Sequence, residues 1–175
     1  MKRFKPLLII LTVLAVVAGA CATVAVMGAA NTPPVKVVVT PTPTPTPQPA
    51  TKEELLRLVN EERAKVGVAP LVLDAKLEQS AQWKADKMTE TGNLAHVDAT
   101  TGRNDGLDYL DSLHPDCTNI GENLRWNVSG NNTALAAIDG WKSSAPHYKA
   151  MVSLLYTSTG FGISGTNIVE HFCQK

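Results

Sequence analysis

Three polar side chains, His96, Glu122 and His147, have the chemical types that bind a metal ion or exchange a proton. They lie 26 and 25 residues apart, so no single helix can bring them together and only the fold can do so. Two neutral imidazoles and one carboxylate can bind Zn²⁺ and leave a position for a water molecule. Such a water molecule loses a proton at about pH 7 and can support hydrolysis. These three residues are therefore our candidate ligand-binding and metal site.

Each of the three residues also has a plainer interpretation when it is taken alone. A histidine that follows a helix commonly forms structural hydrogen bonds, and Glu122 can accept backbone donors in a tight Gly-Asn turn. The chain has no His-Glu-x-x-His helix and no Gly-x-Ser-x-Gly elbow. Ser143 and Ser144 are close to His147 in sequence, but a catalytic triad depends on geometry. A binding site, a buried polar network and a metal-dependent hydrolase remain the three interpretations.

Hydrophobic residues at helical spacing predict the helices that must position these side chains. Thr51 and Glu54 form a capping box at the start of the first helix, and Asp74 is the expected N-cap of the second. Pro146 is expected to end the fourth helix, which puts His147 just past a helix end. The four helices are predicted within 51–67, 73–92, 104–113 and 131–144.

Strand patterns come mostly after the helices. Residues 156–165 and 166–174 read as two short strands joined by a glycine-containing turn, and a third strand is expected within 121–127. Helices followed by strands favour an α+β fold, with helices covering both sides of a small antiparallel sheet.

The N-terminal segment 7–30 is 24 residues long and contains no charged side chain, and an apolar helix needs about 20 residues to span a bilayer. The basic stretch MKRFKP precedes it, which favours a cytoplasmic N-terminus. Three interpretations stay open: an uncleaved signal anchor, a signal peptide cleaved after Ala18-Gly19-Ala20, and a lipoprotein signal acylated at Cys21. All three place the rest of the chain outside the cytoplasm, at the cell membrane or, after cleavage, secreted.

Residues 31–50 contain a Thr-Pro repeat, which predicts an extended polyproline linker of about 3.1 Å per residue. Residues 51–175 have the size of a single domain, which we expect to be a monomer. This domain holds all 16 acidic residues and 12 of the 16 basic ones, so it carries a charge of −4. It has no cluster of Lys and Arg, which argues against a nucleic-acid partner.

Cys117 and Cys173 are the only cysteines of the predicted domain. A lone pair of cysteines in an exported domain usually forms a disulfide. We therefore expect a bond that ties the C-terminus to the segment before Glu122, and the alternative is a redox or metal-binding pair, for which the usual Cys-x-x-Cys spacing is absent.

The order of several motifs resembles the CAP superfamily, which comprises cysteine-rich secretory proteins, antigen 5 and plant pathogenesis-related proteins and is also called the SCP domain. The resemblance covers 52–175 and is greatest to the short bacterial branch, in which a Trp is followed by a Ser three places on and a His six places on. Trp141, Ser144 and His147 keep that spacing. The motifs are the helical segment 55–88, HVDATTG (96–102), IGENL (120–124), WKSSAPHYKAM (141–151) and GFGI (160–163).

The resemblance implies an α–β–α sandwich with a central cleft, lined by two histidines and up to two acidic residues. His96, Glu122 and His147 match three of these four positions, and Ser144 lies near the place of the second acidic residue. Ala-Pro precedes His147 where Pro-Gly is expected, and His171 matches no family role. The family is linked with lipid, sterol and peptide binding. We therefore expect a module that binds an extracellular lipid, peptide or divalent metal such as Zn²⁺, with a metal-dependent hydrolase as the alternative.

Overall fold

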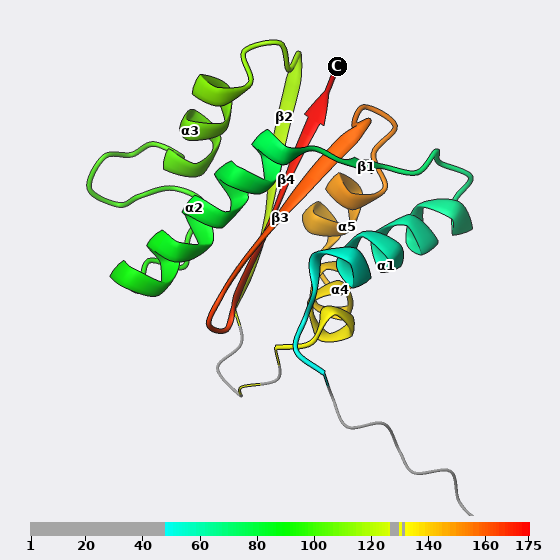
Figure 1. Cartoon of the computed structure of the whole chain (residues 1–175), viewed down its shortest axis with the longest axis horizontal. Coiled ribbons are helices and arrows are strands. Elements are labelled where there is room, and N and C mark those ends of the chain that lie inside the picture. The colour runs from blue at the N-terminus through cyan, green and yellow to red at the C-terminus, as the bar shows by residue number, and fades with distance from the viewer. Residues whose placement is uncertain (1–47, 127–129, 131) are drawn as a thin grey trace, which may run out of the picture. The chain divides into compact units, whose positions relative to one another are not determined.

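A computed structural model describes residues 48–126, 130 and 132–175 (Figure 1). The predicted membrane segment 7–30 and nearly all of the predicted linker lie outside the described residues. Within the described ranges, none of the helices has the length and apolar character that a membrane span requires.

All four predicted helices are present, and the first two begin at their expected N-caps, Thr51 and Asp74. Thr51 Oγ1 accepts the backbone N–H of Glu54 at 3.2 Å, and Asp74 Oδ1 accepts the N–H groups of Lys76 and Leu77. These side chains satisfy backbone donors that have no partner within the helix. The helices are α1 (Lys52–Lys65), α2 (Ala75–Thr91), α3 (Asp105–Leu113) and α4 (Ala134–Lys142).

The interpretation of Pro146 as a helix stop was incomplete, because a fifth helix begins there. Ser144 is the N-cap of α5 (Ala145–Met151), and Pro146 lies in its first turn. Proline is well tolerated at this place, since the first N–H groups of a helix have no intrahelical acceptor. His147 therefore lies in the first turn of α5 and not beyond a helix end.

The sheet has four strands in the order β1-β3-β4-β2. The three predicted strands pair antiparallel, whereas β1 pairs parallel to β3, so the sheet is mixed and not purely antiparallel. β1 has only two residues, too few for a sequence pattern to reveal it. The strands are β1 (Val72–Leu73), β2 (Asn119–Trp126), β3 (Ser158–Ser164) and β4 (Asn167–Gln174).

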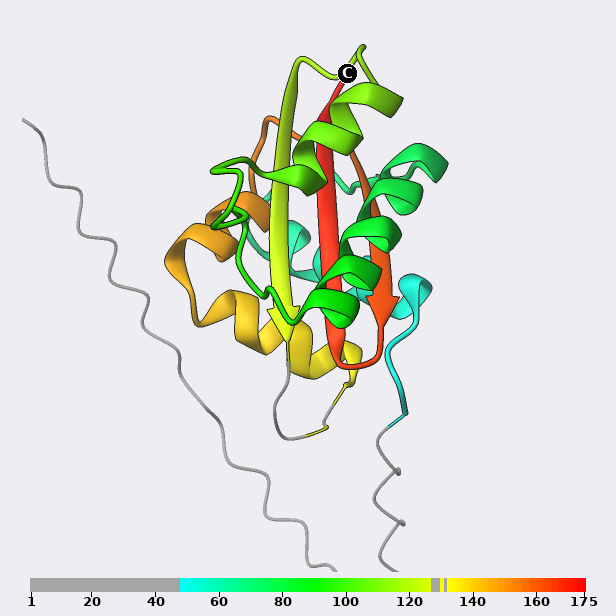
Figure 2. The ribbon, with the colours of Figure 1, turned by 90° about the vertical axis from the view of Figure 1, so that its left-hand side faces the viewer.

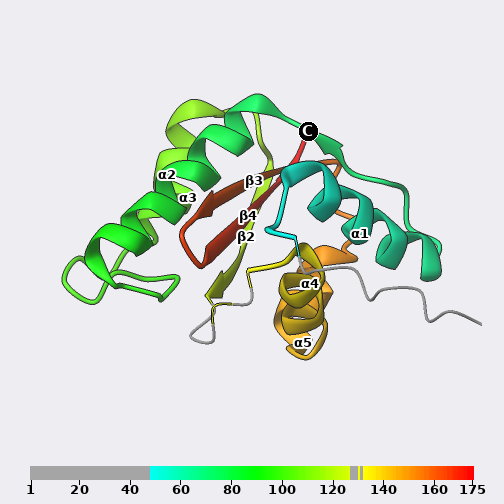
Figure 3. The ribbon, with the colours of Figure 1, turned by 60° about the horizontal axis from the view of Figure 1, so that its bottom comes forward.

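Helices cover both faces of this sheet, which confirms a mixed α+β fold (Figures 1 and 3). α2 and α3 lie on one face, and α1, α4 and α5 lie on the other. Trp141, Phe161 and Phe172 belong to the larger hydrophobic core, on the α1, α4 and α5 side. Ala85 and Val169 pack together on the opposite side. Figure 2 shows β2 running along an edge of the sheet, beside β4.

Two glycines of β3 allow α2 to lie unusually close to the sheet. A Cβ atom added at Gly160 would lie 2.2 Å from the backbone nitrogen of Glu78, and one at Gly162 would lie 2.1 Å from the carbonyl oxygen of Ala81. Real Cβ atoms do not approach backbone so closely, so any side chain there would push α2 away. This close approach brings the inner face of α2 within hydrogen-bonding reach of β4.

The predicted disulfide between Cys117 and Cys173 is present. It joins the end of β4 to the segment before β2 and closes a loop with a sequence separation of 56 residues. Chain-entropy reasoning gives a stabilisation of about 4 kcal/mol for a loop of this size. The bond therefore holds the edge strand β2, which carries Glu122, against its neighbour.

Candidate functional site

The structure brings His96, Glu122 and His147 together from three separate elements. His96 lies in the loop after α2, Glu122 on β2, and His147 in the first turn of α5. His96 Nδ1 lies 2.8 Å from Glu122 Oε1, and His96 Nε2 lies 3.4 Å from His147 Nε2. The imidazole of His96 therefore stands between the carboxylate and the second imidazole.

This meeting takes place beside β2, the last strand on its side of the sheet among the described residues. α2 lies on one face of the sheet and α5 on the other (Figure 3), so the contact between His96, just after α2, and His147 of α5 joins elements from the two faces. Asn123, the next residue of β2, donates from Nδ2 to the backbone oxygen of His147 at 3.2 Å. The start of α5 is thus fixed to the same strand that carries Glu122.

Glu122 is an almost fully buried carboxylate with three hydrogen-bond donors. Its side chain is 1% exposed, and besides His96 it accepts from His171 Nε2 and Asn104 Nδ2, each at 3.0 Å. Burial acts to raise the pKa of this carboxyl, but the hydrogen bonds from His171, His96 and Asn104 outweigh it and hold the pKa at about 2. Glu122 is therefore ionised at neutral pH.

His171, Asn104 and Ser80 belong to the same hydrogen-bond network, and sequence reasoning did not place them there. His171 is fully buried on β4, where it pairs in register with Glu122, and its Nδ1 lies 2.8 Å from Ser80 Oγ. One signal was present: Glu170 and His171 are adjacent polar residues in the middle of β4, between apolar neighbours on both sides, so one must lie on each face. Asn104 and Ser80 gave no such signal.

Gly106 of α3 makes room for the Glu122 carboxylate. A Cβ atom added there would lie 2.6 Å from Glu122 Oε2 and 3.1 Å from Cδ of Lys84. Asn104 caps the same helix, because its Oδ1 accepts the backbone N–H of Leu107 while its Nδ2 donates to Glu122. The start of α3 therefore leaves space for the Glu122 carboxylate and donates one hydrogen bond to it.

The two facing imidazoles are accessible, unlike the carboxylate behind them. The side chain of His96 is 43% exposed. Burial, and then the neighbouring His96 ring, lower the pKa of His147, which favours the neutral imidazole that ligates metals. Two surface hollows, of about 190 and 520 Å³, lie beside Trp83 on α2, and none of the three predicted site residues lines either one.

A second buried glutamate, Glu170, lies on the other face of the same pair of strands. Glu170 pairs in register with Asn123, and the Nδ2 atom of Asn123 lies 3.3 Å from Glu170 Oε2. The other carboxylate oxygen, Glu170 Oε1, lies 3.2 Å from Thr159 Oγ1. Burial raises the pKa of this carboxyl to about 8, and the hydrogen bonds and the charge of Arg63 lower it only in part. The single hydroxyl hydrogen of Thr159 can be donated either to Glu170 Oε1 or to the carbonyl oxygen of His171, which lies 2.9 Å away.

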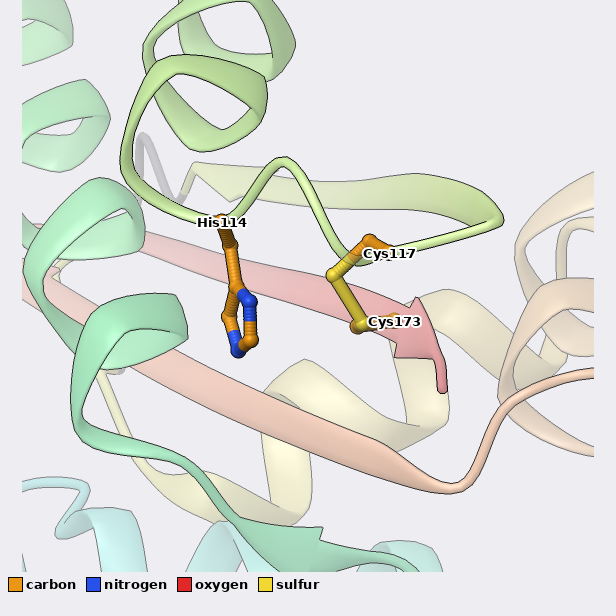
Figure 4. Close-up of side chains that lie close together, drawn as sticks. All are labelled: His114, Cys117 and Cys173. Atoms are coloured by element: carbon orange, nitrogen blue, oxygen red, sulfur yellow. A yellow bond between two sulfur atoms is a disulfide. The ribbon is translucent and has the colours of Figure 1, made fainter.

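Among the described residues, the group of three metal-binding side chains whose ligand atoms all lie within 4.8 Å of one another is His114, Cys117 and Cys173 (Figure 4), and His96, Glu122 and His147 do not meet this spacing as a set of three. The two sulfur atoms are bonded to each other, whereas a metal requires thiolates. The ring nitrogens of His114 face carboxylates instead: Nε2 lies 3.1 Å from Asp74 Oδ2, and Nδ1 contacts Asp116. In the oxidised protein this group is not a metal site.

The architecture is that of solved SCP-type structures. An extracellular protein containing an SCP domain from Bacillus anthracis str. Ames matches with a TM-score of 0.64 at 22% identity, over 71% of this chain and 40% of that one. An outer surface protein from Borrelia burgdorferi matches with a TM-score of 0.62 at 20% identity, over 71% of this chain and 95% of that one. At these identities the likeness establishes the fold alone.

The family follows from the sequence comparisons. Residues 56–173 match the CAP model, described as the cysteine-rich secretory protein family, and the chain belongs to that family. The uncharacterized membrane protein YlbC of Bacillus subtilis (strain 168) is 30% identical over 126 residues, which cover 71% of this chain and 35% of YlbC. The uncharacterized protein YkwD of the same organism is 28% identical over 128 residues, which cover 72% of this chain and 48% of YkwD. The chain thus spans less than half of either relative.

Proposed function

We propose that this chain is an extracytoplasmic CAP module that binds a divalent transition metal between His96 and His147. The observation that carries this proposal is the separation of 3.4 Å between the two Nε2 atoms. Two nitrogen ligands at about 2.0–2.1 Å from a tetrahedral zinc ion lie about 3.3 Å apart. The pair therefore already has the spacing of two ligands of one ion.

The carboxylate has a supporting role in this proposal. Glu122 contacts Nδ1 of His96, the nitrogen that faces away from His147, and both of its oxygens accept hydrogen bonds. A carboxylate behind a ligating imidazole fixes the ring and raises its basicity. We therefore assign His96 and His147 as the ligands and Glu122 as the group that orients His96, in place of a set in which all three residues bind the ion.

Two protein ligands leave coordination positions open on the ion. A bound metal would supply a Lewis acid to which a carboxylate-bearing extracellular ligand, such as a peptide, can coordinate. The hydrolase alternative has less support, because the strongly ionised Glu122 is a weak proton acceptor and has no oxygen free of hydrogen bonds.

The extracytoplasmic location is supported by the sequence and by the names of similar proteins. The apolar segment 7–30 and the Thr-Pro linker have the composition of an export signal or anchor and a spacer. One relative is named a membrane protein, and one solved neighbour is described as extracellular. A disulfide between Cys117 and Cys173 also suits an oxidising compartment.

Calorimetric titration with Zn²⁺ tests the proposal on the full chain in detergent, with the disulfide intact and no thiol reductant. We expect one ion per chain, lost in His96→Ala and His147→Ala. His114→Gln is the matched control, because it removes a histidine outside the site and should leave binding unchanged. Binding that persists in both site variants, or an absence of binding in the unaltered chain, contradicts the proposal.

A further inference from the structure

His171 lies behind the proposed metal site and cannot reach the ion itself. It is 0% exposed, and Glu122 separates it from His96. Five side chains thus form a continuous series of polar contacts from the surface into the core. In order, they are His147, His96, Glu122, His171 and Ser80.

The hydrogen positions in this series follow from the carboxylate. Asn104 Nδ2 can only donate and already bonds Oε1 of Glu122, and each oxygen of the carboxylate faces one ring nitrogen, so both ring nitrogens that face Glu122 are assigned as hydrogen-bond donors. His96 is therefore protonated at Nδ1 and His171 at Nε2. In the neutral form of His96, the lone pair is then left on Nε2, the atom that faces His147. That lone pair is the one that a metal needs.

Ser80 completes the series at its buried end. Its Oγ lies 2.8 Å from His171 Nδ1 and 3.1 Å from the carbonyl oxygen of Leu77. A carbonyl inside an α-helix already accepts a backbone N–H, so the hydroxyl hydrogen can point to the ring nitrogen. Ser80 then donates to Nδ1 of His171 and keeps the hydrogen of that ring on Nε2. The missing side chain at Gly160 is what lets α2 bring Ser80 this close.

We propose that His171 and Ser80 are positioning residues that fix the tautomer and orientation of His96 through the shared carboxylate of Glu122. Neither residue contacts the ion or its ligand. Their effect reaches His96 because Oε2 of Glu122 is held by His171, which leaves Oε1 directed at His96 Nδ1. The expected effect on metal affinity rests on the proposed function. The effect on the His96 tautomer does not, since that tautomer exists in the metal-free chain as well.

Nitrogen NMR of the metal-free full chain in detergent, labelled with ¹⁵N-histidine, reads the tautomers directly. The chain has four histidines, so the ring signals can be assigned by substitution. In its neutral form, the His96 ring should carry its hydrogen on Nδ1. His171→Phe should shift His96 toward the Nε2-protonated form and weaken Zn²⁺ binding about 10- to 100-fold.

Two further variants separate positioning from a general structural role. His171→Gln offers an amide donor at a place similar to Nε2 and should restore the His96 tautomer and most of the affinity. Ser80→Ala should raise the Nδ1-protonated fraction of His171, with a smaller loss of affinity. Ser112→Ala is its control, since it also removes a helical serine hydroxyl close to a helix carbonyl oxygen, that of Tyr109 at 2.7 Å, but lies outside the series.

The outcomes distinguish this role from the proposed function. If folded His171→Phe keeps the wild-type His96 tautomer, or if His171→Phe and His171→Gln behave alike, His171 does not position His96. If His171→Phe fails to fold, an unchanged His171 tautomer in Ser80→Ala overturns the role in the same way. If the unaltered chain binds no Zn²⁺ while the tautomers shift as expected, the positioning role stands and the proposed metal function fails.

Discussion

Glu122 and Glu170 are buried carboxylates on paired strands, one ladder position apart, and they hold opposite charge states. Glu122 pairs with His171 on the face covered by α2 and α3, whereas Glu170 pairs with Asn123 on the face covered by α1, α4 and α5. The pKa of Glu122 is held at about 2, while burial raises that of Glu170 to about 8. At neutral pH the first is an anion and the second is neutral.

The difference shows that the number of hydrogen-bond donors, more than burial, decides whether a buried carboxylate of this sheet is charged or neutral. Glu122 receives donors from two imidazoles and an amide, which favour its charged form. Glu170 has one amide donor and a hydroxyl, and the nearby Arg63 gives its four hydrogen bonds to backbone carbonyls instead. The face that receives more donors is the one that carries the candidate site.

The largest effect is expected from Glu122→Gln. A pKa of about 2 against an ordinary value of 4.5 corresponds to about 3 kcal/mol of folding stability at neutral pH. Because the folded-state pKa is lowered, this stability is present above about pH 4.5 and is lost as the pH falls toward 2. Denaturant unfolding should show the loss at pH 7 and almost none at pH 2. An equal loss at both pH values contradicts the ionised assignment.

The opposite sign is expected for Glu170→Gln. The raised pKa of about 8 means that wild-type stability is greatest below pH 4.5 and declines as the pH rises toward 8. Glutamine keeps similar hydrogen bonds without an ionisable group. The variant should therefore gain about 2 kcal/mol over the wild type between pH 5 and pH 7, measured by the same unfolding experiment. A variant that is destabilised equally at both pH values would show that Glu170 is an anion in the fold.

A smaller effect, confined to the Glu122 face, is expected from Gly106→Ala. The added Cβ would lie 2.6 Å from Glu122 Oε2, so the carboxylate has to shift away from its donors. Overpacking of this kind costs about 1–2 kcal/mol and should also weaken Zn²⁺ binding. Ser112→Ala on the same helix is the control. Unchanged zinc affinity in a folded Gly106→Ala variant would mean that the position of Glu122 does not influence the imidazole pair.

The smallest effect on stability is expected from His147→Ala. Its ring has one polar partner among the described residues, His96 at 3.4 Å, and it is only partly buried. We expect a loss of less than about 1 kcal/mol in thermal or denaturant unfolding, together with loss of zinc binding. A loss of several kcal/mol would assign His147 to a structural network and would not support a ligand-binding role.

Much of the fold was predictable because its signals are local. Capping residues and apolar spacing located α1 to α4, and the pair of cysteines indicated the disulfide. Pro146 was misleading, since the same residue type that ends one helix is favoured in the first turn of the next. The two-residue β1 was missed because parallel pairing with β3 depends on the position of a distant strand.

The candidate site was only partly predictable because its members come from separate elements. His96, Glu122 and His147 were chosen by residue type and by resemblance to a family, and the structure brings them together. The assignment of Glu122 as a direct metal ligand could not be examined without knowing which ring nitrogen it faces. His171 and Ser80 depend on strand register and on the close approach of α2 at Gly160, which no local pattern encodes.

The most direct test of the account is the X-ray absorption spectrum of the full chain loaded with one equivalent of Zn²⁺. We expect two imidazole ligands with Zn–N distances of about 2.0–2.1 Å, light oxygen or nitrogen atoms in the remaining positions, and no sulfur. The imidazole signal should disappear in His96→Ala and His147→Ala. A sulfur shell at about 2.3 Å, or a first shell without imidazole, would contradict a metal site at the His96–His147 pair.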